Sequence, residues 1–482
     1  MNILLYNFVQ FDDQGSPGGG VSVYLRNLVN ELINQGHNVY FLSAGDRYDF
    51  FRKEPFLKFY SEGRLTRCII YNSPFIAPSA SSFHRPDIFT SNIEINSLAD
   101  DLYKEIPEID VFHFHNIEGL TFNFIENLRN IYKKSKFIFS VHNYNLLCMQ
   151  VNLWYKNEKN CLDYSLGENC LNCVKYNDIS LHERKVKFIQ TFLKERIMNK
   201  SKFYNGFYSF LRIIFKKYRY LFNLKNNFFY DENSFNREGN SKKFEEFRLK
   251  NIYMCKEFFD EIICVSERTK EVLIKFGFSS ENISVNYIGT KFYSNYKKTV
   301  LKGKFDDKIT IGYLGYMRSD KGFDFFLDAI ESMSIDLANK INIVVAAGYR
   351  DQDTLDRLET LKEKFEYLKL YNGYNHKNIL NILESIDVGI IPVQWEDNLP
   401  QVAIELVSSG TPILTSDLGG ASEIFSKDTK FIFKHNDVND FYSKLEFLTS
   451  NPGNLSLFWR NQINIFSMDS HLNKLMINYY NC

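Results

Sequence analysis

The sequence predicts an α/β protein made of two doubly wound domains in tandem. Its 482 residues exceed what one hydrophobic core usually supports. Strand-like apolar runs alternate with amphipathic helical segments in two successive sets, and a stretch rich in Lys, Tyr, Asn and Gly separates the sets at 293–307. We therefore expect a first domain over 1–298, a second over 305–458 and a C-terminal helix over 459–482.

The first set begins with a βαβ unit. Its elements are, in order, a strand at 2–9, a glycine-containing loop at 12–20, an amphipathic helix at 21–34 and a strand at 38–43. Strand, loop, helix and strand in this order indicate a parallel sheet. The alternation continues with strands expected at 110–115, 136–142 and 261–266 and a helix at 267–276.

The second set repeats this alternation. Its strands are expected at 309–314, 341–347, 388–392 and 412–416, and its helices at 322–333, 353–365, 379–386, 400–409 and 438–448. Ligands of open parallel sheets bind outside the carboxyl ends of the strands. The polar residues that follow these strands are therefore the first candidates for a functional site.

Composition argues against several classes of protein. Lys plus Arg equals Asp plus Glu at 58 each, which is unlike a globally basic nucleic-acid binder, so no nucleic-acid partner is expected. No run approaches 18 uninterrupted apolar residues, and the first residues lack the features of a signal peptide. We therefore expect a cytoplasmic protein whose eight cysteines are reduced thiols or metal ligands.

The strongest chemical signal is the sequence VGIIPVQWEDNLPQVAIELVSSGTPILTSDLGG, which begins at Val388. A loop-to-helix junction inside it directs free backbone N–H groups and the positive end of a helix dipole outward, which suits a phosphate. Glu405, about one turn into that helix, is placed to accept hydrogen bonds from a ribose diol; a solvated helix residue is the alternative. The ligand-contacting residues expected at the junction are Asn398, Leu399, Gln401 and Val402.

A basic pair follows the first strand of the second set. Arg318 and Lys321 stand between a strand end and a helix, where they are placed to neutralise a pyrophosphate; two solvated loop cations are the alternative. No Asp-x-Asp pair stands at a convincing strand end, so we expect catalysis without a metal cofactor. In the first set, Gly19 and Gly20 belong to a glycine loop that lets backbone approach a ligand closely, although turns also use glycine freely.

These motifs resemble glycosyltransferase family 4, the retaining enzymes of the GT-B fold. The family pattern is close to E-N-L-P-x-V-x-x-E-A-x-x-x-G-x-P, and Asp397 and Glu405 occupy its two acidic positions. The resemblance implies that Glu405 holds the donor ribose and that Asp397 contacts the donor sugar. Asp397 is shorter than the family's glutamate, and Glu396 is the alternative for this role. The family's fold implies two Rossmann-like domains that face each other across a cleft, with the C-terminal helix crossing back to the first.

Other parts of the family pattern match as well. The family's G-R-x-x-x-x-K-G motif implies that Arg318 and Lys321 bind the donor diphosphate, although their interval is slightly shorter here. His142 resembles a family histidine at a strand end that faces the donor sugar or its acceptor. We interpret His113 as structural and leave His115 open. The resemblance covers nearly the whole chain outside about 145–255, which we interpret as an insertion.

This insertion contains four cysteines with the spacing C-x12-C-x8-C-x2-C, namely Cys148, Cys161, Cys170 and Cys173. Four thiols with one close pair can form a tetrahedral zinc site. A subset of the similar enzymes carries a comparable cluster. The sequence leaves open both a structural zinc site and four thiols without a metal.

The insertion also contains a basic aromatic segment at 196–230, with eight Lys or Arg, no Asp or Glu, and twelve aromatic residues. As a helix it would place a basic face beside an apolar one, the pattern of an interfacial segment. We predict peripheral contact with an anionic membrane. A helical hairpin packed on the first domain is the alternative.

The function implied by the resemblance is transfer of a sugar, with retention, from a nucleoside-diphosphate sugar to a hydroxyl of a glycolipid or surface-polysaccharide acceptor, as in lipopolysaccharide or capsule synthesis. We expect such a hexosyltransferase-like enzyme at the inner face of the cell membrane. The leaving phosphate is expected to help deprotonate the acceptor, so no enzyme nucleophile is required. The alternatives are a GT-B-fold sugar-nucleotide epimerase and a non-catalytic GT-B partner subunit.

Overall fold

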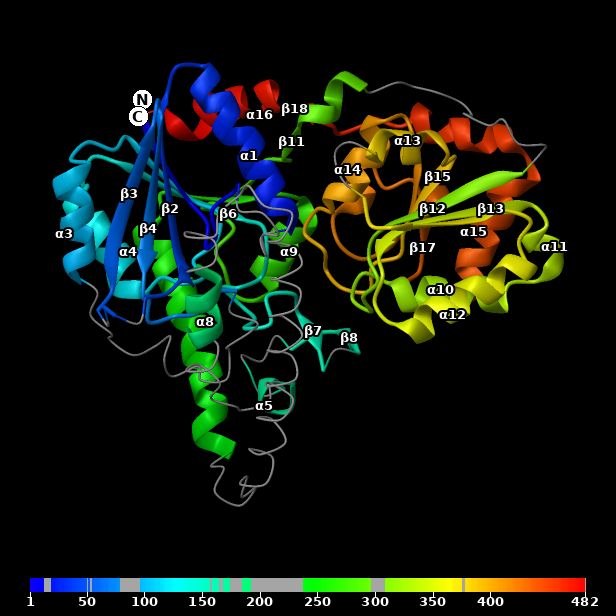
Figure 1. Ribbon diagram of the computed structural model, residues 1–482, viewed down its shortest axis with the longest axis horizontal. Helices are drawn as coiled ribbons and strands as arrows, with labels where there is room; N and C mark the ends of the chain where they lie inside the picture. Colours follow the sequence, from blue (N-terminus) through cyan, green and yellow to red (C-terminus); the bar gives the residue numbers. More distant parts are fainter. Residues whose placement is uncertain are drawn as a thin grey trace.

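A computed structural model shows two α/β lobes side by side, each built on its own sheet (Figure 1). It describes residues 1–12, 19–49, 51–52, 54–78, 96–156, 158–163, 167, 169–173, 184–191, 237–295, 308–374 and 378–481. The basic aromatic segment at 196–230 lies outside these residues. No helix among the described residues is long and apolar enough to cross a membrane.

The first lobe contains an eight-stranded sheet in the order β10-β9-β6-β5-β1-β2-β4-β3. Its strands are β1 (Asn2–Tyr6), β2 (Asn38–Arg47), β3 (Phe56–Glu62), β4 (Leu65–Tyr71), β5 (Val111–Phe114), β6 (Lys136–Val141), β9 (Glu261–Cys264) and β10 (Ile283–Val285). All neighbours pair in parallel except β3, which is antiparallel to β4. The β3–β4 hairpin was not predicted, because half of β3 is exposed and carries polar side chains.

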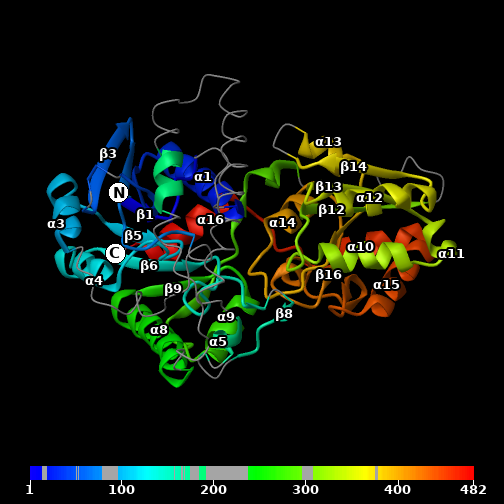
Figure 2. The same ribbon diagram turned by 60° about the horizontal axis from the view of Figure 1, so that its bottom comes forward.

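Helices cover this sheet and extend below it (Figures 1 and 2). They are α1 (Gly19–Asn34), α3 (Asn96–Glu105), α4 (Phe122–Ile131), α8 (Arg237–Phe258) and α9 (Glu267–Lys275). The inserted region adds a short hairpin of β7 (Trp154–Tyr155) and β8 (Lys159–Asn160) and the single turn α5 (Cys170–Cys173). In Figure 1, β8 extends toward the second lobe.

The second lobe contains a six-stranded parallel sheet in the order β14-β13-β12-β15-β16-β17. Its strands are β12 (Ile309–Tyr316), β13 (Ile341–Gly348), β14 (Leu368–Asn372), β15 (Val388–Ile391), β16 (Ile413–Ser416) and β17 (Ile432–Phe433). Its helices are α10 (Phe323–Ser332), α11 (Ile335–Ala338), α12 (Gln352–Thr360), α13 (Ile379–Glu384), α14 (Gln401–Ser408) and α15 (Val438–Ser450), with short turns at η4 (Leu361–Glu363), η5 (Ala421–Phe425), η6 (Thr429–Phe431) and η7 (Pro452–Arg460).

After this lobe the chain crosses back to the first one. Here β18 (Phe466–Ser467) pairs in parallel with β11 (Gly289–Thr290), which leads into η3 (Lys291–Asn295). The helix α16 (Met468–Leu475), continued by the π-helical turn η8 (Met476–Tyr480), packs against α1 (Figure 1). Fully buried Tyr480 and nearly fully buried His471 anchor it there. The predicted architecture, two Rossmann-like domains with a returning C-terminal helix, is therefore confirmed.

Candidate active site

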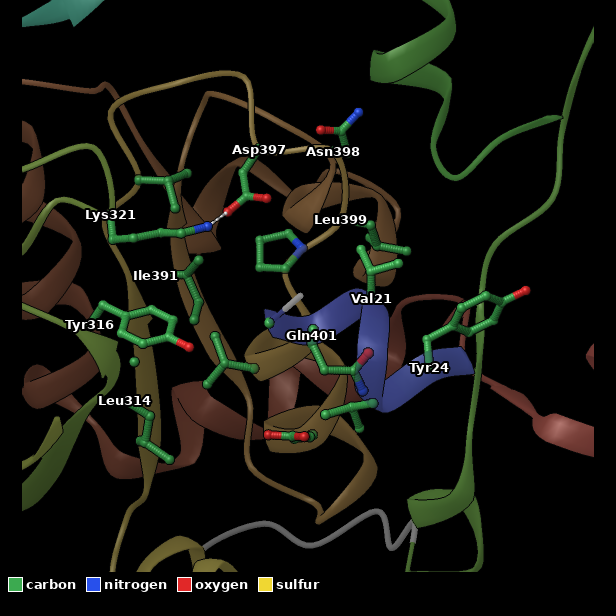
Figure 3. A pocket seen from close by; sticks show the side chains of 18 of the residues that line it. Val21, Tyr24, Leu314, Tyr316, Lys321, Ile391, Asp397, Asn398, Leu399 and Gln401 are labelled. Atoms are coloured by element: carbon green, nitrogen blue, oxygen red, sulfur yellow. Dashed lines mark hydrogen bonds and ion pairs between the residues drawn. The ribbon is translucent and has the colours of Figure 1, made fainter. Parts of the chain in front are cut away.

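A cavity of about 750 Å³ lies between the two lobes. Its first-lobe wall includes the start of α1 and the end of β6, and its second-lobe wall includes the carboxyl ends of β12 and β15 and the first turns of α14 (Figure 3). The predicted site residues that line it are Gly19, Gly20, His142, Lys321, Asp397, Asn398, Leu399, Gln401, Val402 and Glu405. Residues more than 380 positions apart in the sequence therefore meet in one space.

Lys321 provides the cationic group of the second-lobe wall. Its Nζ lies 2.5 Å from Asp397 Oδ2 and 4.9 Å from the centre of the Trp395 ring (Figure 3). The backbone of Gly322 makes this placement possible: a Cβ there would lie 1.6 Å from the carbonyl oxygen of Pro392, and its φ is +76°. Because only glycine fits, the loop after β12 can approach the end of β15 and place Lys321 opposite Asp397.

Arg318 does not join Lys321 in the cavity wall. Its guanidinium binds Asp320 through two contacts, Nε to Oδ1 at 2.9 Å and Nη2 to Oδ2 at 2.5 Å, and 57% of the side chain is exposed. The sequence suggested that the two cations converge on one diphosphate. The structure separates them, because Asp320 offers Arg318 a partner only two residues away.

Glu405 is a buried carboxyl group in the cavity wall, with 6% of the residue exposed. Burial raises the pKa of Glu405 to about 7, although the positive charge of Lys291 opposes this shift. Within the described part of the chain, its carboxyl oxygens make no hydrogen bond. The group lines the cavity and is placed to accept hydrogen bonds from a ligand there, as a ribose-binding carboxylate requires.

The two adjacent acids of the loop before α14 have different partners. Asp397 faces the cavity and Lys321, whereas Glu396 is 1% exposed and accepts a hydrogen bond from Arg268 Nε at 2.7 Å. A second contact joins Arg268 Nη2 to Glu396 Oε1. Of the two candidates for the first acidic role, only Asp397 is available to a ligand. Nothing in the sequence identified Arg268 as a partner.

The start of α1 forms the opposite wall. Gly19 has a φ of +53°, and a Cβ on Gly20 would lie 3.2 Å from Cβ of Gln401 at the start of α14. In Figure 3, Val21 of α1 lies beside Leu399. Gly20 therefore allows the first turns of two helices to meet across the cavity, where their N–H groups favour an anion.

His142 lines the same wall and belongs to a buried histidine network. Its Nε2 lies 3.0 Å from His115 Nδ1. Burial, with a smaller contribution from His471, lowers the pKa of His142 to about 3, so the ring is neutral. His113 lies deeper, with its ring nitrogens 2.6 Å from the Tyr480 hydroxyl and 2.7 Å from Ser140 Oγ, which agrees with a structural role.

Tyr24 is a cavity residue that the sequence analysis did not identify. Its hydroxyl lies 2.9 Å from His471 Nε2, and its ring centre lies 5.1 Å from that of His142. His471 Nδ1 in turn lies 2.9 Å from the carbonyl oxygen of Tyr287. The returning helix α16 therefore supports a residue of the cavity wall, through contacts between positions 447 residues apart that no local pattern reveals.

The four predicted cysteines of the insertion meet around a separate cavity of about 20 Å³. Burial raises the pKa of each thiol, and Cys173 Sγ accepts hydrogen bonds from the Lys156 N–H at 3.1 Å and from Gln150 Nε2 at 2.9 Å. Arg248 Nη2 lies 3.3 Å from Cys170 Sγ. Across the described ranges, however, no three His, Cys, Asp or Glu side chains are arranged to hold a metal ion. The zinc site stays a prediction.

Part of the chain is similar in sequence to known proteins. Residues 297–463 match the family model described as "Glycosyl transferases group 1". An uncharacterized 42.6 kDa protein in the cps region of Klebsiella pneumoniae is 25% identical over 189 residues, and the uncharacterized glycosyltransferase MJ1607 of Methanocaldococcus jannaschii is 25% identical over 191. These alignments cover 38% and 36% of this chain, and 45% and 46% of the relatives' own lengths.

Solved structures resemble the whole chain. Sucrose-phosphate synthase of Thermosynechococcus elongatus superimposes with a TM-score of 0.58 at 12% identity, covering 99% of this chain and 98% of that one. Anabaena Alr3699/HepE in complex with UDP has a TM-score of 0.54 at 10% identity, with 99% of both chains covered. The GT-B fold is confirmed. The family match supports an enzyme of the glycosyltransferase class.

Proposed function

We propose that this chain is a retaining glycosyltransferase of the family 4 type, which moves a sugar from a nucleoside-diphosphate sugar to a hydroxyl of a saccharide or glycolipid acceptor. The observation that carries the proposal is the cavity between the lobes. One wall combines a lysine, an aspartate and a buried carboxyl group that has no hydrogen-bond partner among the described residues. The facing wall contains the start of α1, a helix that begins at Gly19.

The second-lobe wall holds the donor in this proposal. Lys321 neutralises the diphosphate together with the free N–H groups at the start of α14, and Glu405 accepts hydrogen bonds from the ribose diol. Asp397 positions Lys321 and contacts the transferred sugar. Arg318, which is already paired with Asp320 outside the cavity wall, has the smaller part.

The reaction breaks the bond between C1 of the donor sugar and the β-phosphate oxygen and forms a bond from C1 to the acceptor oxygen. The acceptor proton passes to the departing phosphate on the same face, so the products are a nucleoside diphosphate and a glycoside with retained configuration. Neutral His142 contributes a hydrogen bond from the opposite wall and carries no charge in this step. Lys321 and the helix N–H groups stabilise the charge that develops on the leaving group.

Two comparisons support the donor and acceptor classes. A similar Escherichia coli structure is bound with UDP-2-fluoro glucose, and a similar Anabaena structure is a complex with UDP and glucose. The Klebsiella relative belongs to a cps region, which supports a surface-polysaccharide acceptor assembled at the inner face of the membrane.

A panel of UDP-, GDP-, ADP- and dTDP-sugars tests the proposal by calorimetry and by product analysis. We expect one donor class to bind and, with an acceptor from its surface-polysaccharide pathway, to be consumed with retention, also in the presence of EDTA. Release of free epimerised donor would indicate an epimerase, and donor binding without turnover a non-catalytic subunit. Failure of every donor to bind would refute the proposal.

A further inference from the structure

The first turn of α9 is the part of the first lobe that holds the loop carrying Asp397. Ser266, the residue that caps this helix, donates its hydroxyl to the carbonyl oxygen of Asn398 at 2.6 Å. The Asn398 side chain donates to Thr269 Oγ1 at 3.2 Å. Arg268, between them, binds Glu396 through both Nε and Nη2. Three residues of one helix turn, Ser266, Arg268 and Thr269, therefore hold one loop across the lobe boundary.

The second lobe also supplies the cap for the backbone of that turn. Glu423 accepts hydrogen bonds from the N–H groups of Glu267 at 2.8 Å and Arg268 at 2.7 Å, and from the Tyr287 hydroxyl at 2.9 Å. A carboxylate at this point satisfies free N–H groups and interacts favourably with the helix dipole. The N-terminal backbone of α9 is therefore satisfied by a residue of the other lobe.

The loop itself has little room to move independently. A Cβ on Gly419 would lie 2.3 Å from the carbonyl oxygen of Asp397, and one on Gly420 would lie 2.3 Å from that of Asn398. Adjacent side chains point opposite ways: Glu396 toward α9, and Asp397 toward Lys321. A displacement of Glu396 is therefore transmitted to Asp397 through one peptide unit.

The ion pair between Glu396 and Arg268 forms only when the two lobes lie against each other, because each lobe supplies one of the charges. The Glu396 side chain is 2% exposed, and its other partners are weaker donors, the Gly419 N–H at 3.2 Å and Asn160 Nδ2 at 3.3 Å. A buried carboxylate without a cation is costly, and Arg268 supplies that cation only when α9 lies against the loop.

We propose that Arg268 is a positioning residue: through Glu396 it holds Asp397, and with it Lys321, in the arrangement that receives the donor diphosphate only when the two lobes are together. This inference rests on the proposed function for its consequence in turnover. Its structural part, the placement of the loop by α9, is independent of which donor binds.

Arg129 provides a matched control. It pairs with Asp260 through two contacts of 3.0 and 2.7 Å, and its side chain is 28% exposed, compared with 26% for Arg268. The control matches the arginine and not the carboxylate, because Asp260 is 30% exposed and Glu396 is 2% exposed. The Arg129 pair, however, lies within the first lobe, and its partners among the described residues, Ser135 and Phe137, do not line the cavity. Arg129→Gln therefore measures what the loss of a half-buried ion pair does to the fold alone.

The experiment compares Arg268→Gln, Glu396→Gln, Arg129→Gln and the charge-swapped double variant Arg268→Glu/Glu396→Arg. Hydrogen–deuterium exchange of peptides covering 394–400 is measured without ligand. The kcat and the donor KM are then measured with the nucleotide sugar that the donor panel identifies. We expect both single variants at the interface to exchange faster at 394–400 and to lose about tenfold in kcat/KM, with partial recovery in the double variant. Arg129→Gln should leave both readouts unchanged.

Two results would overturn the inference. One is exchange at 394–400 in Arg268→Gln equal to that in Arg129→Gln, and the other is faster exchange with unchanged kcat/KM. If wild type binds no nucleotide sugar, the proposed function fails. The exchange comparison then still decides whether Arg268 places the loop.

Discussion

The two walls of the interlobe cavity differ in how they use charge. The second-lobe wall turns Lys321, Asp397 and Glu405 toward the cavity, and Glu405 has no partner among the described residues. The charged first-lobe lining residues, Asp12 and Arg26, are engaged within their own lobe, by Arg67 and by a backbone carbonyl. In the proposed function, the charge of the donor is therefore balanced by one lobe, whereas the other lobe contributes shape, backbone N–H groups and a neutral histidine.

The largest expected effect tests the charged wall directly. Lys321→Ala removes the cation that compensates the diphosphate and separates Asp397 from its cation. The transition-state stabilisation calculated from kcat/KM should therefore fall by about 2–4 kcal/mol. Arg318→Ala, measured in the same assay, should cost less than about 1 kcal/mol because that side chain is exposed and paired with Asp320. Equal losses in the two variants would show that the cations act as a pair after all.

Glu405→Gln separates binding from stability. The pKa of Glu405 is about 7 in the folded protein and near 4.5 when unfolded, so wild-type stability falls as pH rises from about 4.5 to about 7. The glutamine variant avoids this loss, and should be more stable than wild type by about 3 kcal/mol at pH 8 and equal to it near pH 4. Its nucleotide affinity should fall roughly tenfold at pH 8.

Chemical denaturation at the two pH values and calorimetric titration with the nucleoside diphosphate measure these effects. A variant that is no more stable than wild type at pH 8 would contradict a carboxyl group whose pKa is raised by burial at this position.

His142→Gln tests the neutral wall. Because burial keeps the pKa of His142 near 3, the ring does not titrate at physiological pH, and its loss should cost about one neutral hydrogen bond, roughly 0.5–1.5 kcal/mol. The pH profiles of wild type and variant between 6 and 9 should have the same shape. A profile that loses an inflection in the variant would show that His142 takes part in proton transfer.

Substitutions in the cysteine cluster should affect protein stability and leave donor binding in the interlobe cavity unchanged. If zinc is bound, elemental analysis should find about one atom per chain, and Cys170→Ser with Cys173→Ser should lower the melting temperature without changing donor affinity. A fully stable, metal-free wild-type protein would contradict the zinc prediction and leave the comparison of the two walls intact.

Substitutions in the segment at 196–230, which lies outside the described residues, should have the smallest effect on donor binding. Lys216→Glu with Lys217→Glu should reduce sedimentation with anionic vesicles at low salt, because basic residues near anionic lipid contribute on the order of 1 kcal/mol each. Donor affinity should be unchanged. Equal sedimentation of wild type and variant would favour a hairpin packed on the first lobe.

The sequence predicted the features that depend on residues close together in the chain. The strands of both sheets that are buried on both faces are continuous apolar runs, and Lys321, Asp397 and Glu405 stand at strand ends or in a recognisable helix junction. The half-exposed edge strands β3 and β14 lack that signal and were not predicted. The partners of Glu396 and Tyr24 were also missed, since they lie 128 and 447 residues away and follow from tertiary packing alone.

The return of α16 to the first lobe has a consequence for biosynthesis. The hydroxyl of Tyr480 lies against His113 in the strand β5, and His471 holds Tyr24 of α1. During synthesis, residues 1–285 leave the ribosome well before Tyr480 and His471 have been added to the chain. The interior of the first lobe therefore stays incomplete, with its histidines lacking those partners, until the second lobe has been made. A fragment ending near residue 295 should accordingly fold poorly, although it contains every strand of the first sheet.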